Sequence, residues 1–387
     1  MVEPILNWAP ASPVNEYLAR INWQELCSRA SRLNQGHRCA ALDLVNAGLN
    51  HVIRILEFQD SQHTRWVVSI PKDGPCETKK RNFGLRAEVD VMMLLNEKGL
   101  SIPRIFDYEL NADNPVGAAF ILMEFLPGNV AMDAFGGWES HRGLLPLEYR
   151  PKLYSGIATL QKKLASVRFS KIGIVVRDVH GEYNIGPFPD LGGPFKTSSS
   201  FFEAWAQYAQ FPTRSLELLR QMSDGNQKQL AHEISDAIAQ FPTRLAEMAK
   251  AGYMNLKAGP FPVCHTDLMH SNIVVDEGCR VLGIIDWEGA CTLPWEMVEY
   301  PLFLDTIPQI FNTPDKYDRD GKPLDDDTRQ CWQDRETYLG MVRSAECTDH
   351  RLSDSLGDVK SLGLAYAVRL FNAGKLGFYD QVLDQYL

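Results

Sequence analysis

The chain has 387 residues, of which 45% are hydrophobic, which excludes an intrinsically disordered protein and suggests about two folding units. The net charge at pH 7 is −10, from 39 basic and 49 acidic residues, and it argues against a nucleic-acid partner. No apolar run is long enough to cross a bilayer, so we expect no membrane partner. The eight cysteines form no C-x-x-C pair and residues 1–4 lack signal character, so we expect a reduced, cytoplasmic protein with free thiols.

Three strands are predicted in the first part of the chain, at residues 40–45, 51–58 and 66–71. The first two read as a hairpin whose turn contains Gly48 and Asn50. In the third strand, alternation places Ser69 on the opposite face from Val68. The sequence therefore predicts an antiparallel sheet in which Ser69 lies on one face and Val68 on the other.

A helix and two further strands follow. Residues 79–81 are all basic and predict a solvated turn, and residues 85–95 have the apolar spacing of an amphipathic helix. Residues 103–108 and 120–126 predict two more strands, the second of which ends in a Pro-Gly turn. These elements complete a small α+β unit.

Beyond residue 129 the sequence becomes mainly helical. Residues 147–167 carry one helix, and residues 201–250 predict a helical region rich in aromatic side chains at its start. Such aromatics form a core, or some of them line a pocket; the sequence leaves both open. Residues 181–197 are rich in Gly and Pro and predict a long loop, whereas the acidic residues 325–327 are interpreted as a solvated turn rather than a cation site.

The chemistry is concentrated between residues 263 and 288. An apolar lead-in is followed by a polar loop with Asp267 and Asn272 five positions apart, and an apolar strand then ends at Asp286. This is the order of the catalytic loop and the metal-binding strand in kinase-like phosphotransferases. In that chemistry Asp267 accepts the proton of the attacking group, while Asn272 and Asp286 hold Mg²⁺ on the phosphates of a nucleotide.

The residues of this stretch resemble one family in particular. Residues 264–267 and 271–274, followed by Ile-Ile-Asp-Trp-Glu at 284–288, look like the aminoglycoside phosphotransferase family, and Pro-Trp-Glu at 294–296 is similar to its long fungal members of uncharacterised substrate. The resemblance covers residues 40–300. No G-x-S-x-G elbow or G-x-G-x-x-G turn supports a hydrolase or a dinucleotide-binding protein.

The resemblance implies a nucleotide site in the first part of the chain. It implies that the turn with Gly48 and Asn50 covers the phosphates with backbone N–H groups. It also implies that Glu124 and Leu126 lie in the hinge that binds adenine through its backbone. We expect His265 to brace the catalytic loop by hydrogen bonding to backbone near Asp286.

The sequence departs from the family at Ser69. Relatives carry a Lys or Arg at this position, which contacts the α- and β-phosphates and pairs with a helix glutamate, here Glu88. We expect Arg54 on the preceding strand to substitute for the missing cation, with Lys72 as the alternative.

The predicted architecture is α+β: a two-lobed, protein-kinase-like fold with a small antiparallel-sheet lobe and a larger, mainly helical lobe. Residues 1–38 are predicted to be a helical extension, residues 39–125 the small lobe, and residues 126–387 the large lobe with the catalytic loop and a helical substrate-binding insert. The extension either packs as a helix on the small lobe or covers a nucleotide as a lid.

The predicted function is ATP- and Mg²⁺-dependent phosphorylation of a hydroxyl on a small molecule. The alternative is a pseudokinase, or a user of the same fold for other small-molecule chemistry, and Ser69 is the feature that supports it. The sequence names neither the acceptor nor the oligomeric state.

Overall fold

The computed structural model describes residue 6 and residues 16–48, 50–72, 78–137, 145–222, 228–254 and 256–387. Internal contacts divide the chain into two compact units, each described here by itself. Unit 1 comprises Met1–Gly156, Val176–Tyr183 and Met269–Ala290, and unit 2 comprises Ile157–Val175, Asn184–Leu268 and Cys291–Leu387. This division does not follow chain order, because the hairpin after the catalytic loop joins unit 1. The boundaries at residues 38 and 125 stay a prediction.

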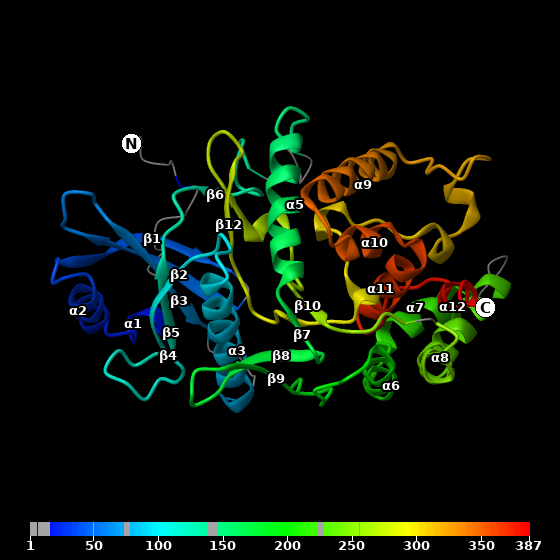
Figure 1. Cartoon of the computed structure of the whole chain (residues 1–387), viewed down its shortest axis with the longest axis horizontal. Helices are drawn as coiled ribbons and strands as arrows, with labels where there is room; N and C mark the ends of the chain where they lie inside the picture. The colour runs from blue at the N-terminus through cyan, green and yellow to red at the C-terminus, as the bar shows by residue number, and fades with distance from the viewer. Residues whose placement is uncertain are drawn as a thin grey trace. The chain divides into compact units, whose positions relative to one another are not determined.

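Unit 1 is built on a five-stranded antiparallel sheet in the order β1-β2-β3-β5-β4. Its strands are β1 (Cys39–Ala47), β2 (His51–Phe58), β3 (Arg65–Pro71), β4 (Ile105–Glu109) and β5 (Phe120–Glu124). The sheet runs from blue to cyan in Figure 1. The predicted hairpin and all the strands predicted before residue 126 are confirmed.

Two helices pack on opposite faces of this sheet (Figure 1). Helix α2 (Trp23–Leu33) follows the short α1 (Glu16–Ala19) and packs Leu26 and Ala30 into a core with Val68 and other sheet residues. Helix α3 (Thr78–Glu97) lies on the other face. The extension therefore packs as a helix on the small lobe, as predicted. The expected turn at residues 79–81 is wrong, because α3 already begins at Thr78.

A three-stranded antiparallel sheet in unit 1 carries the metal-site sequence. Its order is β12-β11-β6, with β6 (Asn129–Val130), β11 (Ile273–Val275) and β12 (Val281–Ile284), and the 3₁₀ turn η1 (His270–Asn272) leads into β11. Two positions in this region require glycine, because neighbouring backbone atoms leave no room for a side chain. A Cβ at Gly128 would lie 2.2 Å from the Val275 carbonyl oxygen, and one at Gly283 would lie 2.8 Å from the Ser101 carbonyl oxygen.

Unit 2 is mainly helical. Its helices are the C-terminal part of α5 (Arg150–Ser166), α6 (Ser198–Tyr208), α7 (Thr213–Met222), α8 (Lys228–Ala251), α9 (Asp326–Ala345), α10 (Arg351–Gly357), α11 (Val359–Phe371) and α12 (Tyr379–Asp384). A small sheet in the order β7-β10-β13-β8-β9 accompanies them, formed by β7 (Arg168–Phe169), β8 (Gly173–Arg177), β9 (Tyr183–Gly186), β10 (Phe261–Cys264) and β13 (Cys291–Thr292).

Two predictions for this part of the chain are corrected. The predicted loop at residues 181–197 contains β9, whose four residues are too few to give a recognisable alternation of polar and apolar residues in the sequence. Helix α9 was not predicted, because it is mostly polar and buries only Tyr338 and Val342. The acidic run at residues 325–327 was interpreted as a solvated turn, but α9 begins at Asp326 and Asp325 caps it by accepting from the Thr328 N–H at 2.8 Å.

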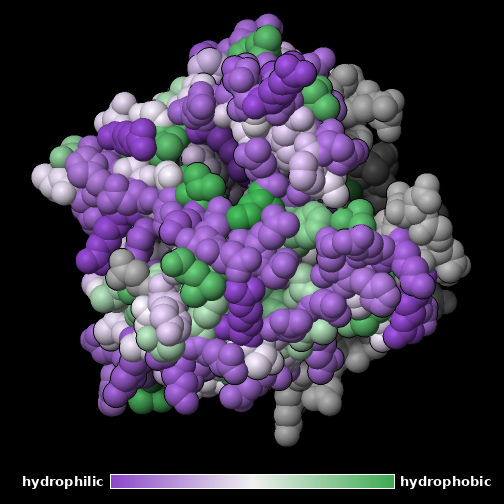
Figure 2. Space-filling model, turned by 90° about the vertical axis from the view of Figure 1, so that its right-hand side faces the viewer, coloured by the Kyte–Doolittle hydropathy of each residue, from purple (hydrophilic) through white to green (hydrophobic). Residues whose placement is uncertain are grey.

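On the face shown in Figure 2, hydrophobic residues form separate small patches among hydrophilic ones. None of the helices in the described ranges is both long and apolar enough to cross a bilayer.

Candidate functional site

A short hairpin in unit 1 brings Asn272 next to Asp286. Ile273 pairs with Ile284, and the Ile285 N–H donates to the Asn272 carbonyl oxygen at 2.9 Å, so the residues that flank the two strands meet at one end of the hairpin. Asn272 is buried at 5% exposure, whereas Asp286 is exposed. Asp286 also adopts φ 62°, a conformation that is uncommon outside glycine and that Asp and Asn tolerate best.

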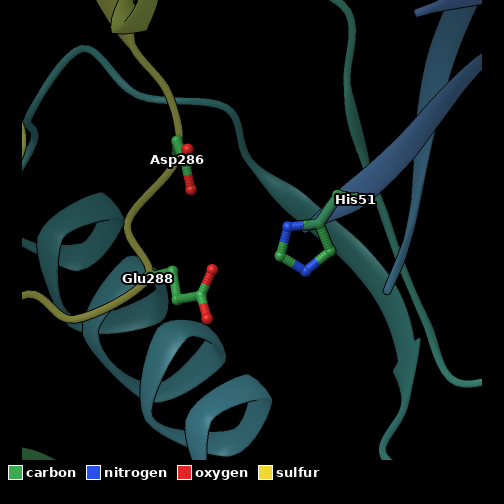
Figure 3. Close-up of side chains that lie close together, drawn as sticks. All are labelled: His51, Asp286 and Glu288. Atoms are coloured by element: carbon green, nitrogen blue, oxygen red, sulfur yellow. The ribbon is translucent and has the colours of Figure 1, made fainter. Parts of the chain in front are cut away.

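Three side chains that can ligate a metal meet beside this hairpin. Figure 3 shows His51, from the start of β2, facing the carboxylates of Asp286 and Glu288. The ligand atoms of these residues lie within 4.8 Å of one another. Asn50, in the turn before β2, donates its side-chain N–H to Glu288 Oε2 at 3.0 Å. The β1–β2 turn is thus directly linked to the segment that follows β12.

The cluster is negatively charged and has a buried acid beside it. Burial of Glu88 on α3, together with the charges of Asp286 and Glu288, raises the pKa of this carboxyl to about 8. Burial lowers the pKa of His51. The charges of Glu288 and Asp286 act in the opposite direction, and the charge of Lys72 lowers this pKa further. Within the described ranges no cation pairs with Glu88, so the helix glutamate has no partner of the usual kind.

Ser69 lies on the predicted face, but Arg54, which was expected to replace the family's cation, lies on the opposite face of the sheet. Ser69 pairs with Ile53, while Arg54 pairs with Val68 and therefore projects from the α2 face of the sheet. There Arg54 donates to the Leu42 carbonyl oxygen at 2.6 Å, and its guanidinium lies 4.4 Å from the centre of the Trp23 ring. The strand register thus turns the Arg54 side chain away from the face of Ser69, which argues against the phosphate role predicted for Arg54.

Lys72, unlike Arg54, lies near the cluster of His51, Asp286 and Glu288. Its ammonium donates to the Gly48 carbonyl oxygen, and its backbone N–H donates to the Asn50 carbonyl oxygen at 2.7 Å. The charge of Lys72 acts on His51, which places it near the cluster. Lys72, which directly follows β3, therefore contacts the turn of Gly48 and Asn50 at the edge of the cluster of His51, Asp286 and Glu288.

The predicted catalytic loop lies in unit 2. The His265 Nδ1 accepts a hydrogen bond from the Asp267 N–H at 3.2 Å, so His265 supports the loop from within, and the contact expected near Asp286 stays a prediction. Asp267 itself is exposed. His265 and Thr266 line a cavity of about 320 Å³ together with Phe201, Trp205 and the Glu299–Arg369 ion pair. Three aromatics of α6, Phe201, Phe202 and Trp205, are therefore buried, and Phe201 and Trp205 also line the cavity, whereas Tyr208 is exposed.

The hinge residues lie at the end of β5. Glu124 donates its N–H to the Arg104 carbonyl oxygen at 2.8 Å and accepts from the Arg104 N–H through its carboxylate at 3.2 Å. The Leu126 carbonyl oxygen accepts from the Gly128 N–H at 2.8 Å. The adenine contacts expected of both residues stay a prediction.

Sequence reasoning did not identify two members of this site, His51 and Glu288. Glu288 lies in the quoted Asp-Trp-Glu sequence, and its spacing of two residues from Asp286 was the available signal. His51 follows directly on the turn of Gly48 and Asn50, and only the register of β2 shows which face it takes.

Curated relatives of the chain come from yeasts. The chain is 23% identical over 330 residues to the Saccharomyces cerevisiae (strain RM11-1a) protein "Altered inheritance of mitochondria protein 9, mitochondrial", a match covering 70% of this chain and 51% of that protein. The protein of the same name from Eremothecium gossypii is 25% identical over 323 residues, covering 69% of this chain and 51% of that protein. The chain thus spans about half the length of these relatives.

The names of these relatives contradict the predicted cytoplasmic location, because both are called mitochondrial proteins. The prediction used free thiols, and these separate oxidising from reducing compartments without distinguishing one intracellular compartment from another.

Solved structures with matching arrangements are those of small-molecule phosphotransferases. An aminoglycoside phosphotransferase APH(4)-Ia mutant is 15% identical with a TM-score of 0.42, covering 90% of this chain and 88% of its own. An amicoumacin kinase in complex with AMP-PNP, Ca²⁺ and Ami is 15% identical with a TM-score of 0.40, covering 96% of each chain.

The profile described as "Phosphotransferase enzyme family" matches residues 54–295, which is more than half of the chain. The match includes the third strand, the helix glutamate, the hinge, the catalytic loop and the hairpin that ends at Asp286. The predicted kinase-like α+β fold is confirmed with it. The chain belongs to the phosphotransferase enzyme family.

Proposed function

We propose that the chain transfers the γ-phosphoryl group of ATP to a hydroxyl of a small molecule. The observation that carries this proposal is the hairpin of β11 and β12, which brings Asn272 and Asp286 to one end with a 2.9 Å backbone bond between their segments. An amide oxygen and a carboxylate are ligands that suit a divalent cation on nucleotide phosphates.

The residues present fit a divalent cation. Asp286 is exposed and negatively charged, and burial of Glu88, together with the charges of Asp286 and Glu288, raises the pKa of the Glu88 carboxyl. Such crowding of like charges is relieved by a bound cation. Asn272 and Asp286 would hold Mg²⁺, which when bound would supply positive charge to stabilise the phosphoryl group during transfer.

Asp267 is the proposed base. Its sequence position, five residues before Asn272, matches the catalytic-loop pattern, and its backbone N–H is held by His265 at 3.2 Å. An exposed carboxylate held at a fixed loop position can orient a hydroxyl and accept its proton as the phosphoryl group leaves ATP. His265 is accordingly a positioning residue.

The cavity next to His265 and Thr266 is the proposed acceptor pocket. At about 320 Å³ it is large enough for a small metabolite. Its lining is mostly apolar and also includes the Glu299–Arg369 ion pair. The aromatic side chains of Phe201 and Trp205 favour an acceptor with an apolar body over a bare sugar. As the yeast relatives are named mitochondrial, we propose that the acceptor is met in that compartment.

A pseudokinase is the second candidate; it is favoured by Ser69 at the position where the resemblance implies a cation, and by the buried Glu88, which pairs with no cation in the described part of the chain. Calorimetry with ATP, with and without Mg²⁺, separates the two. The phosphotransferase predicts Mg²⁺-dependent ATP binding in the wild type that is weakened at least about ten-fold in Asp286→Asn, because the amide lacks the charge that attracts the cation. Asparagine tolerates the φ of 62°, so this variant tests charge rather than folding.

Absence of ATP binding at millimolar concentration in the wild type would overturn the phosphotransferase and support the pseudokinase. Equal Mg²⁺-ATP affinity in the wild type and Asp286→Asn would overturn the metal role of Asp286 alone.

A further inference from the structure

The cluster of His51, Asp286 and Glu288 has a composition that a magnesium site does not require. Its members come from two separate places in unit 1, the start of β2 and the segment after β12, yet their ligand atoms lie within 4.8 Å of one another (Figure 3). Two carboxylates and one imidazole thus surround a single position.

The imidazole changes which cation fits. Mg²⁺ takes oxygen ligands and retains water, so an imidazole adds little to its binding. First-row transition-metal dications accept nitrogen and carboxylate oxygen together, and mixed sites of this kind are typical of Mn²⁺ and Fe²⁺. His51 is therefore the residue that discriminates between the two classes of cation.

Two further observations point to a cation at this position. The Glu88 side chain is 5% exposed and has no ion-pair partner in the described part of the chain. The negative charges of Asp286 and Glu288 both act on its carboxyl group. In addition, Asn50 donates to one oxygen of Glu288 at 3.0 Å and so fixes the orientation of that carboxylate. A hydrogen bond that orients a ligand is a common feature of metal sites.

We propose that His51, Asp286 and Glu288 bind a transition-metal dication of the Mn²⁺ or Fe²⁺ type in preference to Mg²⁺. The site shares Asp286 with the proposed function and rests on it only through that residue, since metal binding is measured on the chain without nucleotide. A chain that binds Mn²⁺ through His51 but transfers no phosphoryl group would refute the proposed function and leave this site intact.

The test uses Mn²⁺ as the probe on the full chain. Pulsed electron paramagnetic resonance detects the ¹⁴N nucleus of a coordinated imidazole directly, which a purely structural role of His51 would not produce. We expect ¹⁴N modulation on bound Mn²⁺ in the wild type and in His180→Ala, the matched control, whose histidine is exposed in unit 1. We expect the modulation to be absent in His51→Ala.

Calorimetry supplies the second readout. The ratio of Mn²⁺ to Mg²⁺ affinity is expected to fall about ten-fold or more in His51→Ala, because the variant keeps both carboxylates and loses only the nitrogen ligand. The ratio is expected to stay unchanged in His180→Ala. Bound Mn²⁺ without ¹⁴N modulation in the wild type, or an unchanged ratio in His51→Ala, would overturn the proposal; the wild-type spectrum decides even if the variant fails to fold.

Discussion

At the scale of single residues, Ser69 stands where the resemblance implies a lysine or arginine. Glu88 is buried, no cation in the described ranges pairs with it, and its carboxyl keeps a proton to a pKa of about 8 because burial and two neighbouring carboxylates oppose ionisation. Lys72 lies at the β1–β2 turn, where it contacts the Gly48 carbonyl oxygen. We propose that Lys72, just past the end of β3, supplies the positive charge that the resemblance implies at Ser69.

The protonated Glu88 predicts a pH dependence of stability. The folded-state pKa of about 8 lies above the ordinary value of 4.5, so between these pH values the unfolded chain loses a proton that the folded chain retains. This group's contribution therefore falls as pH rises through that window, by on the order of 3–5 kcal/mol. Glu88→Gln removes the effect, and its stability relative to the wild type should increase from pH 5 to pH 8.

Urea unfolding in the presence of a chelator measures this difference, since a bound cation would favour the ionised carboxylate. A stability difference between Glu88→Gln and the wild type that is the same at pH 5 and pH 8 would show that Glu88 is ionised in the fold.

Lys72 is predicted to contribute to ATP binding, and Arg54 is not. A charge-assisted hydrogen bond contributes roughly 1.5–3 kcal/mol, so Lys72→Ala should weaken Mg²⁺-ATP binding about 10- to 100-fold. Arg54→Ala is the matched removal of a cation from the opposite face of the same sheet. Calorimetry on both variants, after their folding is checked by circular dichroism, decides the assignment, and it is reversed if Arg54→Ala gives the larger loss.

At the scale of elements, the hairpin of β11 and β12 is held by close backbone approach rather than by side-chain packing alone. Strand β6 pairs with β11 through Val130 and Val274, and Gly128 lies against the Val275 carbonyl oxygen just before that pairing. The segment after the hinge is thus tied to the strand that carries Asn272. This contact makes the position of the metal-site hairpin depend on a glycine that has no chemistry of its own.

Gly128→Ala is predicted to destabilise the fold. The added Cβ would lie 2.2 Å from the Val275 carbonyl oxygen, so the backbone must move, which costs about 1–3 kcal/mol. Gly340→Ala in α9 is the matched control, because no atom lies within 4 Å of its Cβ, and helix propensity predicts a gain of up to about 1 kcal/mol. Urea denaturation compares the two; a Gly128→Ala chain as stable as the wild type would show that β6 and β11 separate without cost.

At the scale of the whole molecule, sequence reasoning reached the fold class, the early strands and the two strands that precede Asp286, because apolar periodicity and motif spacing are local signals. It did not reach the direction of Arg54, since a register shift of one residue reverses the face of a side chain and the sequence does not record register. It also missed His51, whose partners lie more than two hundred positions away in the sequence. The polar helix α9 was missed for lack of an apolar stripe.

The central claim is that Asp267 is the base of a phosphoryl transfer from ATP. The most direct test measures transfer of radiolabelled γ-phosphate from ATP to small hydroxylated metabolites, with Mg²⁺ or Mn²⁺, in the wild type and in Asp267→Ala. We predict labelled product with the wild type and a rate about 10²–10⁴-fold lower in the variant, with ATP affinity nearly unchanged because Asp267 does not bind the nucleotide. An acceptor that Asp267→Ala phosphorylates at more than about a tenth of the wild-type rate would contradict the claim.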